Sequence, residues 1–176
     1  MKLMRIKSRI AAAIIVFAFT ACMSQDNMSE RTGTAKSASN TAYDFNLKDI
    51  DTGESVKLSN FSGTPVFLDF WATWCPPCRQ AMPYVEKLHE EMGDSIQVIG
   101  INLDRSQSKA VQFLESKSPG YMQLTASGSD VSSKYRVSGI PAFFIIDTNG
   151  KIAKSYVGFS PHQYDEWVSI LEGLVE

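Results

Sequence analysis

Two apolar runs flank a stretch of helical periodicity in the middle of the chain. Val66–Phe70 and Ile96–Leu103 are dominated by aliphatic and aromatic side chains, which is typical of strands buried on both faces of a sheet. Between these runs, apolar residues recur every three or four positions, which predicts an amphipathic helix that ends near Gly93. These apolar positions are Cys78, Ala81, Met82, Val85, Leu88 and Met92. The order strand, helix, strand predicts a right-handed crossover between parallel neighbours.

The flanking segments predict hairpins and two further helices. Two pairs of short apolar segments are each separated by a turn sequence, which is typical of antiparallel hairpins. The pairs are Tyr43–Leu47 with Ser55–Leu58, and Phe143–Ile146 with Ile152–Val157. One helix is expected over Ser108–Ser116, and another begins at Ser160, where Pro161 and Gln163 complete a helix-start signal. We therefore expect an α/β fold in which helices cover both faces of a central mixed sheet.

The N-terminal segment has the layout of a signal peptide over residues 1–21. Basic residues precede the apolar run Ile10–Phe19, and small residues follow it. The run is too short to span a membrane, which takes about 20 residues, so a retained anchor is the weaker interpretation. Phe19-Thr20-Ala21-Cys22 resembles the lipobox of bacterial lipoproteins, which implies that Cys22 carries lipid. The alternative is ordinary cleavage with Cys22 as an incidental thiol.

Residues 22–42 are expected to tether the folded domain. Met23–Ala42 is rich in Ser, Thr, Asn and Ala and contains no aromatic residue and no Val, Ile or Leu. Such a segment cannot pack a core, so it predicts a flexible linker. The folded domain is expected to cover residues 43–176, a length sufficient for one hydrophobic core.

Composition narrows the classes of function. The formal charge of the 176-residue chain is −2, which argues against a nucleic-acid partner. An aromatic content of 11% and the absence of repeats exclude fibrous and wholly disordered proteins, and three cysteines are too few for a small disulfide-stapled domain. His89 and His162 are the only histidines, and both are expected to be solvated helix residues rather than metal ligands.

Cys75-Pro76-Pro77-Cys78 connects the first buried strand to the helix. Backbone N–H groups and the dipole at a helix N-terminus favour negative charge, so a thiolate is stabilised there. Proline suits a first helical turn because its missing N–H would have no helical partner. The competing interpretation is half of a zinc site, but such a site needs four ligands and the domain offers no second pair. The motif favours redox chemistry without a metal or other cofactor.

Two motifs make the chain similar to the thioredoxin superfamily, and within it to membrane-tethered, extracytoplasmic thiol-disulfide oxidoreductases of the TlpA/ResA type. The first is Asp69-Phe70-Trp71-Ala72-Thr73-Trp74, which runs directly into the CxxC motif. The second is Val137-Ser138-Gly139-Ile140-Pro141, which resembles the cis-proline loop of that superfamily. The resemblance covers roughly residues 43 to 176 and implies a thioredoxin-like fold.

The resemblance implies roles for individual residues. Cys75 would be the nucleophile and Cys78 would resolve the mixed disulfide. Asp69 lies in an apolar strand, where a carboxyl has a raised pKa, and would accept the proton of Cys78. The alternative for Asp69 is a carboxyl bonded to backbone at a strand end. A cis peptide bond at Pro141 would leave the backbone of Ile140 free to pair with an extended substrate. The residues expected to bind substrate are Trp74, Pro76, Pro77 and Ile140.

Other functions stay open as alternatives. Members of the TlpA/ResA type often carry a Glu three residues after the second cysteine, where this chain has Ala81, so Asp69 is expected to handle the proton. A peroxiredoxin-like peroxidase would have a Thr three residues before its reactive cysteine, where this chain has Ala72. A copper chaperone of the Sco type would use CxxxC with a downstream His.

We expect a reductant of extracytoplasmic disulfides. Because the thiolate would be held by the helix start without a His between the cysteines, its pKa should resemble that of thioredoxin. The expected partners are disulfide-containing client proteins and a membrane protein that passes electrons outward for re-reduction. The resemblance makes cytochrome c maturation, on the periplasmic side of a bacterial membrane, a suitable task.

Overall fold

The computed structural model describes residues 40–175 of the protein. The expected signal peptide, the lipidation site at Cys22 and most of the linker lie outside these residues. Packing begins ahead of Tyr43, the residue at which the sequence predicts the folded domain to start. Ala42 is already buried, and its N–H donates to the carbonyl of Gly150 at 2.9 Å.

Seven strands form one mixed sheet in the order β2-β1-β5-β4-β3-β6-β7. The parallel central strands are β3 (Val66–Trp71), β4 (Gln97–Asn102) and β5 (Met122–Thr125). The antiparallel strands are β1 (Asn46–Asp49), β2 (Ser55–Lys57), β6 (Ala142–Ile146) and β7 (Ile152–Val157). The expected mixed sheet is confirmed, and β3 lies near its centre between β4 and β6.

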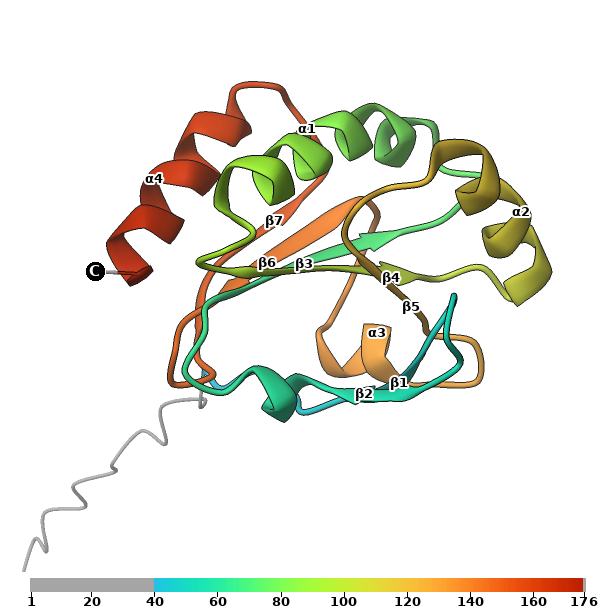
Figure 1. Ribbon diagram of the computed structural model, residues 1–176, viewed down its shortest axis with the longest axis horizontal. Coiled ribbons are helices and arrows are strands. Elements are labelled where there is room, and N and C mark those ends of the chain that lie inside the picture. The colour runs from blue at the N-terminus through green and yellow to red at the C-terminus, as the bar shows by residue number, and fades with distance from the viewer. Residues whose placement is uncertain (1–39, 176) are drawn as a thin grey trace, which may run out of the picture. The chain divides into compact units, whose positions relative to one another are not determined.

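Helices cover both faces of this sheet (Figure 1). The helices α1 (Pro76–Met92), α2 (Gln107–Lys117) and α4 (Gln163–Val175) pack on one face. The short helix α3 (Val131–Lys134) and a 3-10 turn at Leu58–Phe61 pack on the other. The strands β3 and β4 are parallel and α1 connects them, as predicted. None of the helices within residues 40–175 is both long enough and apolar enough to cross a membrane.

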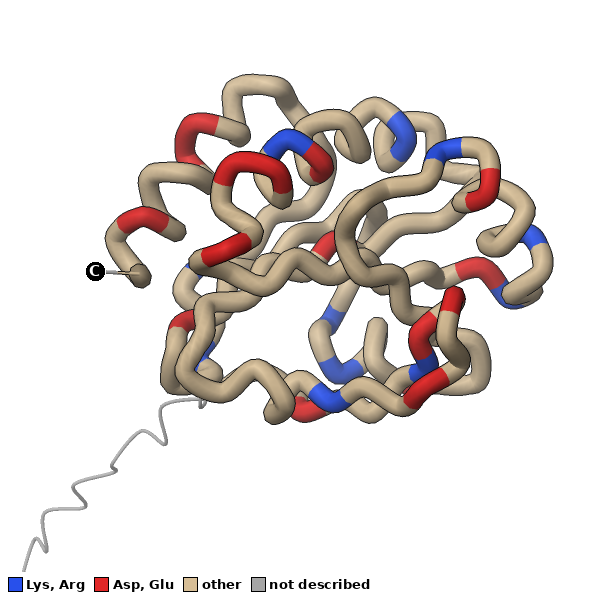
Figure 2. Tube along the Cα trace, viewed as in Figure 1, with Lys and Arg blue, Asp and Glu red and all other residues tan. Residues whose placement is uncertain are grey.

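Alternate residues of β3 enter hydrophobic clusters on opposite faces of the sheet, because successive side chains of a strand point to opposite faces. Phe67 faces α1 and α4 and packs against Trp167 with ring centroids 5.0 Å apart. Phe70 faces the other way and packs against Tyr135 at 5.3 Å. Charged residues lie mostly on helices and turns (Figure 2). Asp69, in the middle of β3, is a fully buried exception.

The sequence patterns predict neither β5 nor α3. Each has only four residues, which is too short for a period of 2 or 3.6 to be recognised. The pairing of β5 with β4 on one side and β1 on the other defines it as a strand. Its place in the sheet therefore depends on partners that are distant in sequence.

Candidate active site

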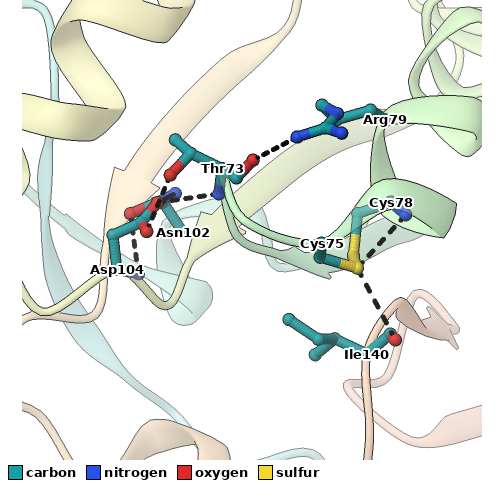
Figure 3. Close-up of a disulfide and its surroundings, with 7 residues drawn as sticks. All are labelled: Thr73, Cys75, Cys78, Arg79, Asn102, Asp104 and Ile140. Atoms are coloured by element: carbon teal, nitrogen blue, oxygen red, sulfur yellow. Dashed lines mark hydrogen bonds between the residues drawn. A yellow bond between two sulfur atoms is a disulfide. The ribbon is translucent and has the colours of Figure 1, made fainter.

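The CxxC motif forms a disulfide at the start of α1. Cys75 is the N-cap residue of the helix, Pro76 and Pro77 occupy its first positions, and Cys75 is bonded to Cys78. The N–H of Cys78 donates to Sγ of Cys75 at 3.2 Å (Figure 3). In the reduced protein this N–H and the helix N-terminus stabilise negative charge on the same sulfur.

The two sulfurs differ in their access to solvent. Cys75 is 3% exposed in the disulfide form and Cys78 is fully buried, so an incoming sulfur meets Cys75 first. Trp74, directly before Cys75, is 66% exposed, and Pro76 and Pro77 are exposed as well. Apolar side chains therefore surround the accessible edge of the disulfide.

Pro141 closes the site from the side of β6. The Ile140–Pro141 peptide bond is cis, as the resemblance implies. The carbonyl oxygen of Ile140 lies 3.7 Å from Sγ of Cys75 (Figure 3). Val157 at the end of β7 is 61% exposed and flanks the same loop beside Gly139. The sequence patterns do not identify Val157, because its place follows from the register of β6 with β7.

We call the exposed and half-buried apolar side chains around the disulfide the apolar rim. It consists of Trp74, Pro76, Pro77, Ile140 and Val157. The four residues expected to bind substrate thus lie around one sulfur, although they come from two loops that are far apart in the sequence. Exposed apolar surface beside a reactive group is typical of a protein-binding site.

Asp104 fixes the loop that carries Cys75. Its carboxylate accepts from both the N–H and the hydroxyl of Thr73, each at 2.9 Å, and from the side-chain amide of Asn102 at 2.8 Å (Figure 3). On the other side of the loop, the guanidinium of Arg79 donates to the carbonyl of Thr73 at 2.8 Å. The sequence reasoning missed Asp104. The sequence feature that could have indicated it is the polar pair Asn102 and Asp104 at the end of β4, which lies beside the end of β3.

We predict that Asp104→Asn lowers the free energy of unfolding by about 1.5–3 kcal/mol, because it removes a buried charge that accepts three hydrogen bonds. The rate of disulfide exchange should fall as well, since the loop of Cys75 loses its tether. Urea unfolding and exchange with a model disulfide measure the two effects. The control is Asp147→Asn, since Asp147 accepts two backbone N–H bonds in a distant turn. It should leave the exchange rate unchanged. Wild-type behaviour of Asp104→Asn in both assays would contradict the role of Asp104.

Asp69 lies behind the disulfide on the face of β3 that α1 covers. It is fully buried, and neither carboxylate oxygen has a hydrogen-bond partner among the described residues. Burial raises the pKa of Asp69 from 3.8 to about 8. The alternative interpretation, a carboxyl bonded to backbone, requires hydrogen bonds that this side chain does not make within residues 40–175.

The histidines lie away from the disulfide motif. His89 is half-buried and its ring lies 6.3 Å from that of Tyr121, so it is a packing residue rather than the solvated one that the sequence predicts. His162 is exposed in the turn before α4. Within the described part of the chain, no three Cys, His, Asp or Glu side chains gather as a metal site.

Residues 37–173 match the sequence model of the Redoxin family. The thiol-disulfide oxidoreductase ResA of Oceanobacillus iheyensis is 31% identical, over 85% of this chain and 77% of the relative. The thioredoxin-like protein YneN of Bacillus subtilis is 34% identical, over 66% of this chain and 69% of the relative.

Solved structures that resemble this chain are also named as thiol-disulfide or thioredoxin proteins. A Chlorobium tepidum protein assigned as thiol:disulfide interchange protein DsbE is 33% identical, with a TM-score of 0.74 over 78% of this chain and 97% of the other. The exposed lipoprotein thioredoxin Etrx1 of Streptococcus pneumoniae is 27% identical, with a TM-score of 0.67 over 75% of this chain and 100% of the other. The chain therefore belongs to the Redoxin family and is a ResA-like thiol-disulfide oxidoreductase of the thioredoxin superfamily.

Proposed function

We propose that the protein reduces disulfides of extracytoplasmic client proteins through Cys75 and Cys78, while lipid on Cys22 holds it at the outer side of a bacterial membrane. The observation that carries the proposal is the CxxC disulfide at the start of α1, facing the carbonyl of Ile140 across the cis-proline loop. The relatives named as thiol-disulfide oxidoreductases support this function over a peroxidase or a copper chaperone.

The reaction proceeds by two thiol–disulfide exchanges. The thiolate of Cys75 attacks one sulfur of the client disulfide, forms a mixed disulfide and releases the other client sulfur as a thiolate. Asp69 then takes the proton of the Cys78 thiol. The Cys78 thiolate attacks Sγ of Cys75, and the electron pair of the broken mixed disulfide leaves on the client sulfur that Cys75 had attacked. The client gains two electrons, and the enzyme is left with the Cys75–Cys78 disulfide.

The apolar rim supports binding of extended polypeptide. The backbone of Ile140 lies beside the reactive sulfur, where a client strand can pair with it, and the exposed side chains of Trp74 and Val157 offer apolar contacts. An oxidised haem-attachment CxxC of an apocytochrome c, whose disulfide must be reduced, is one client of this kind, which agrees with a task in cytochrome c maturation.

The surroundings of Cys75 favour reduction over oxidation. A dithiol becomes more oxidising as its thiolate form is stabilised more strongly. Pro76 and Pro77 add no charge between the cysteines, and the guanidinium of Arg79 is bonded to the carbonyl of Thr73. In an oxidising compartment the protein then needs a membrane electron donor that reduces it after each turnover.

Trapping of clients tests the proposed function. The variant Cys78→Ser keeps the nucleophile but cannot resolve the mixed disulfide, so clients should stay attached to Cys75. Expressed as the full chain in a bacterial host, it should form complexes with extracytoplasmic proteins that a reductant releases. The matched control Cys75→Ser should capture none. Capture of the same set by both variants, or of none by Cys78→Ser, would contradict the proposal.

Cys22→Ala is predicted to release the protein from membranes, because it removes the residue that carries the anchor. Fractionation after a salt wash, followed by detection of the protein in the soluble and sedimented fractions, measures the effect. The control Ser24→Ala retains Cys22 and should sediment with membranes as the wild type does. Sedimentation of Cys22→Ala with the membranes would show that lipid at Cys22 is not the anchor.

A further inference from the structure

A row of residues crosses the sheet from Asp69 to the unpredicted strand β5. Asp69 on β3 is paired with Gly100 on β4, and Gly100 is paired with Gln123 on β5. Residues paired across neighbouring strands project from the same face of a sheet. Asp69 and Gln123 therefore face α1 and α2 together, with a residue that has no side chain between them.

Gln123 fills the space above Gly100. A Cβ atom placed on Gly100 would lie 2.2 Å from Oε1 of Gln123 and 2.8 Å from its Nε2. The side chain of Gln123 therefore extends across β4 toward β3 and Asp69. Any larger residue at position 100 would displace the Gln123 amide from this place.

Trp71 sets the direction in which the amide of Gln123 points. The indole N–H of Trp71 donates to Oε1 of Gln123 at 3.0 Å. An amide oxygen accepts hydrogen bonds whereas its nitrogen only donates, so this bond fixes Nε2 as the free end of the side chain. Nε2 is buried and has no hydrogen-bond partner within residues 40–175.

The unpaired polar atoms near the row complement one another. Both carboxylate oxygens of Asp69, Nε2 of Gln123 and the hydroxyl of Tyr121 are buried without a partner among the described residues. The carboxylate accepts, the amide nitrogen donates, and the hydroxyl does both. Buried polar groups almost always have hydrogen-bond partners, and a water molecule commonly bridges those that do not touch directly.

Gln123 also lines a surface hollow, with Ile50 and Leu114, between α2 and the β1–β2 turn.

We propose that Gln123 is a positioning residue for Asp69: through a bridging water supplied from the hollow beside α2, its Nε2 supports the ionised carboxylate that accepts the proton of Cys78. The inference rests on the proposed role of Asp69 as proton acceptor. A hydrogen bond to the charged form of a carboxyl favours that form and so opposes the effect of burial. None of the residues that line the hollow belongs to the apolar rim, so the proton can return to solvent while a client covers the disulfide.

Few other titratable groups face the row. From α1 these are Cys78, Glu86 and His89, and beside β5 it is Tyr121. The pKa of Tyr121 is raised first by burial and then by the charge of Asp69, and the neighbouring side chain of Gln123 acts to lower it. The strands β4 and β6 present Gly100 and Phe143 to Asp69, and α4 presents the non-titrating Trp167. The titratable residues that line the hollow are Asp51 and Glu115.

The test follows the carboxyl carbon of Asp69 by NMR between pH 5 and pH 10 in the oxidised full chain, in which the active-site cysteines do not titrate. The signal is assigned by its loss in Asp69→Asn. Gln123→Met preserves the length of the side chain and removes the amide, and it should raise the titration midpoint by about one pH unit. Gln112→Met, on the exposed face of α2, is the matched control and should leave the midpoint unchanged.

Two further measurements do not depend on the folding of Gln123→Met. Gly100→Ala places a methyl group where the amide lies and should raise the midpoint as well. In the wild type, the side-chain amide signal of Gln123 should titrate with the midpoint of Asp69. A flat amide signal, or an unchanged midpoint in a folded Gln123→Met, would overturn the inference. Normal turnover of Asp69→Asn would instead refute the proton-acceptor role and leave the link between Gln123 and Asp69 standing.

Discussion

Cys75→Ser should lower the rate of disulfide exchange by on the order of 10³-fold or more, because the nucleophile is lost. Serine has nearly the same size, and the fold does not rest on this sulfur, so the variant should remain folded. Cys78→Ser should still complete the first exchange, since its Cys75 keeps the N-cap position and the backbone N–H of residue 78. The two cysteines should therefore differ in kind: one starts the reaction and the other finishes it.

Alkylation of the reduced protein with a limiting reagent near pH 7, followed by peptide mapping, measures the same difference without a variant. Cys75 should be labelled first, because its sulfur is the one stabilised by the helix start and accessible to the reagent. Stopped-flow exchange with a small disulfide then compares the two serine variants. Equal labelling of Cys78, or rapid exchange by Cys75→Ser, would reverse the assignment of the nucleophile.

Asp69→Asn should stabilise the oxidised protein at pH 8 and change its stability much less at pH 5. The native state holds the Asp69 proton up to about pH 8, whereas the unfolded chain releases it near 3.8. Between these values the native state binds more protons, so the free energy of unfolding falls as pH rises. Over three pH units, one such group lowers the free energy of unfolding by on the order of 4 kcal/mol. The uncharged amide of Asn at position 69 causes no such loss.

Urea unfolding of the wild type and of Asp69→Asn at pH 5, 6, 7 and 8 measures the difference in their free energies of unfolding. Groups other than Asp69 titrate equally in the two proteins and cancel in this difference. The disulfide must stay closed so that thiol ionisation does not contribute. If Asp69 is also the proton acceptor, the same variant resolves mixed disulfides more slowly, and the wild-type rate rises with pH through about 8. A stability difference that does not grow with pH would mean that Asp69 is not a buried group with a raised pKa.

Local signals account for the elements that the sequence predicts. The apolar runs around Phe67 and Ile99 are long enough to show buried strands, and the prolines after Cys75 mark the start of α1. The loop at Pro141 was found through its resemblance to a known motif, because the residues alone do not fix a peptide isomer. These signals place the disulfide, but they do not give the order of the strands.

The residues that sequence reasoning missed depend on that order. Gln123 lies on a strand of four residues, and its side chain extends toward Asp69 only because β4 lies between β3 and β5 and carries Gly100 at the crossing point. Asp104 supports Thr73 only because the ends of β3 and β4 are adjacent. Such contacts between distant positions have no periodic or compositional signature in a single chain.

The reduction potential of the Cys75–Cys78 couple shows whether this couple reduces its clients. The full chain is equilibrated with glutathione buffers of graded ratio, and the oxidised fraction is read from the mass added by alkylation of free thiols. The thiolate of Cys75 is held by the helix start and one backbone N–H. We therefore predict a potential close to that of thioredoxin, about −270 mV. A value more positive than about −180 mV, that of protein disulfide isomerase, would contradict a reducing role and indicate an oxidase or isomerase.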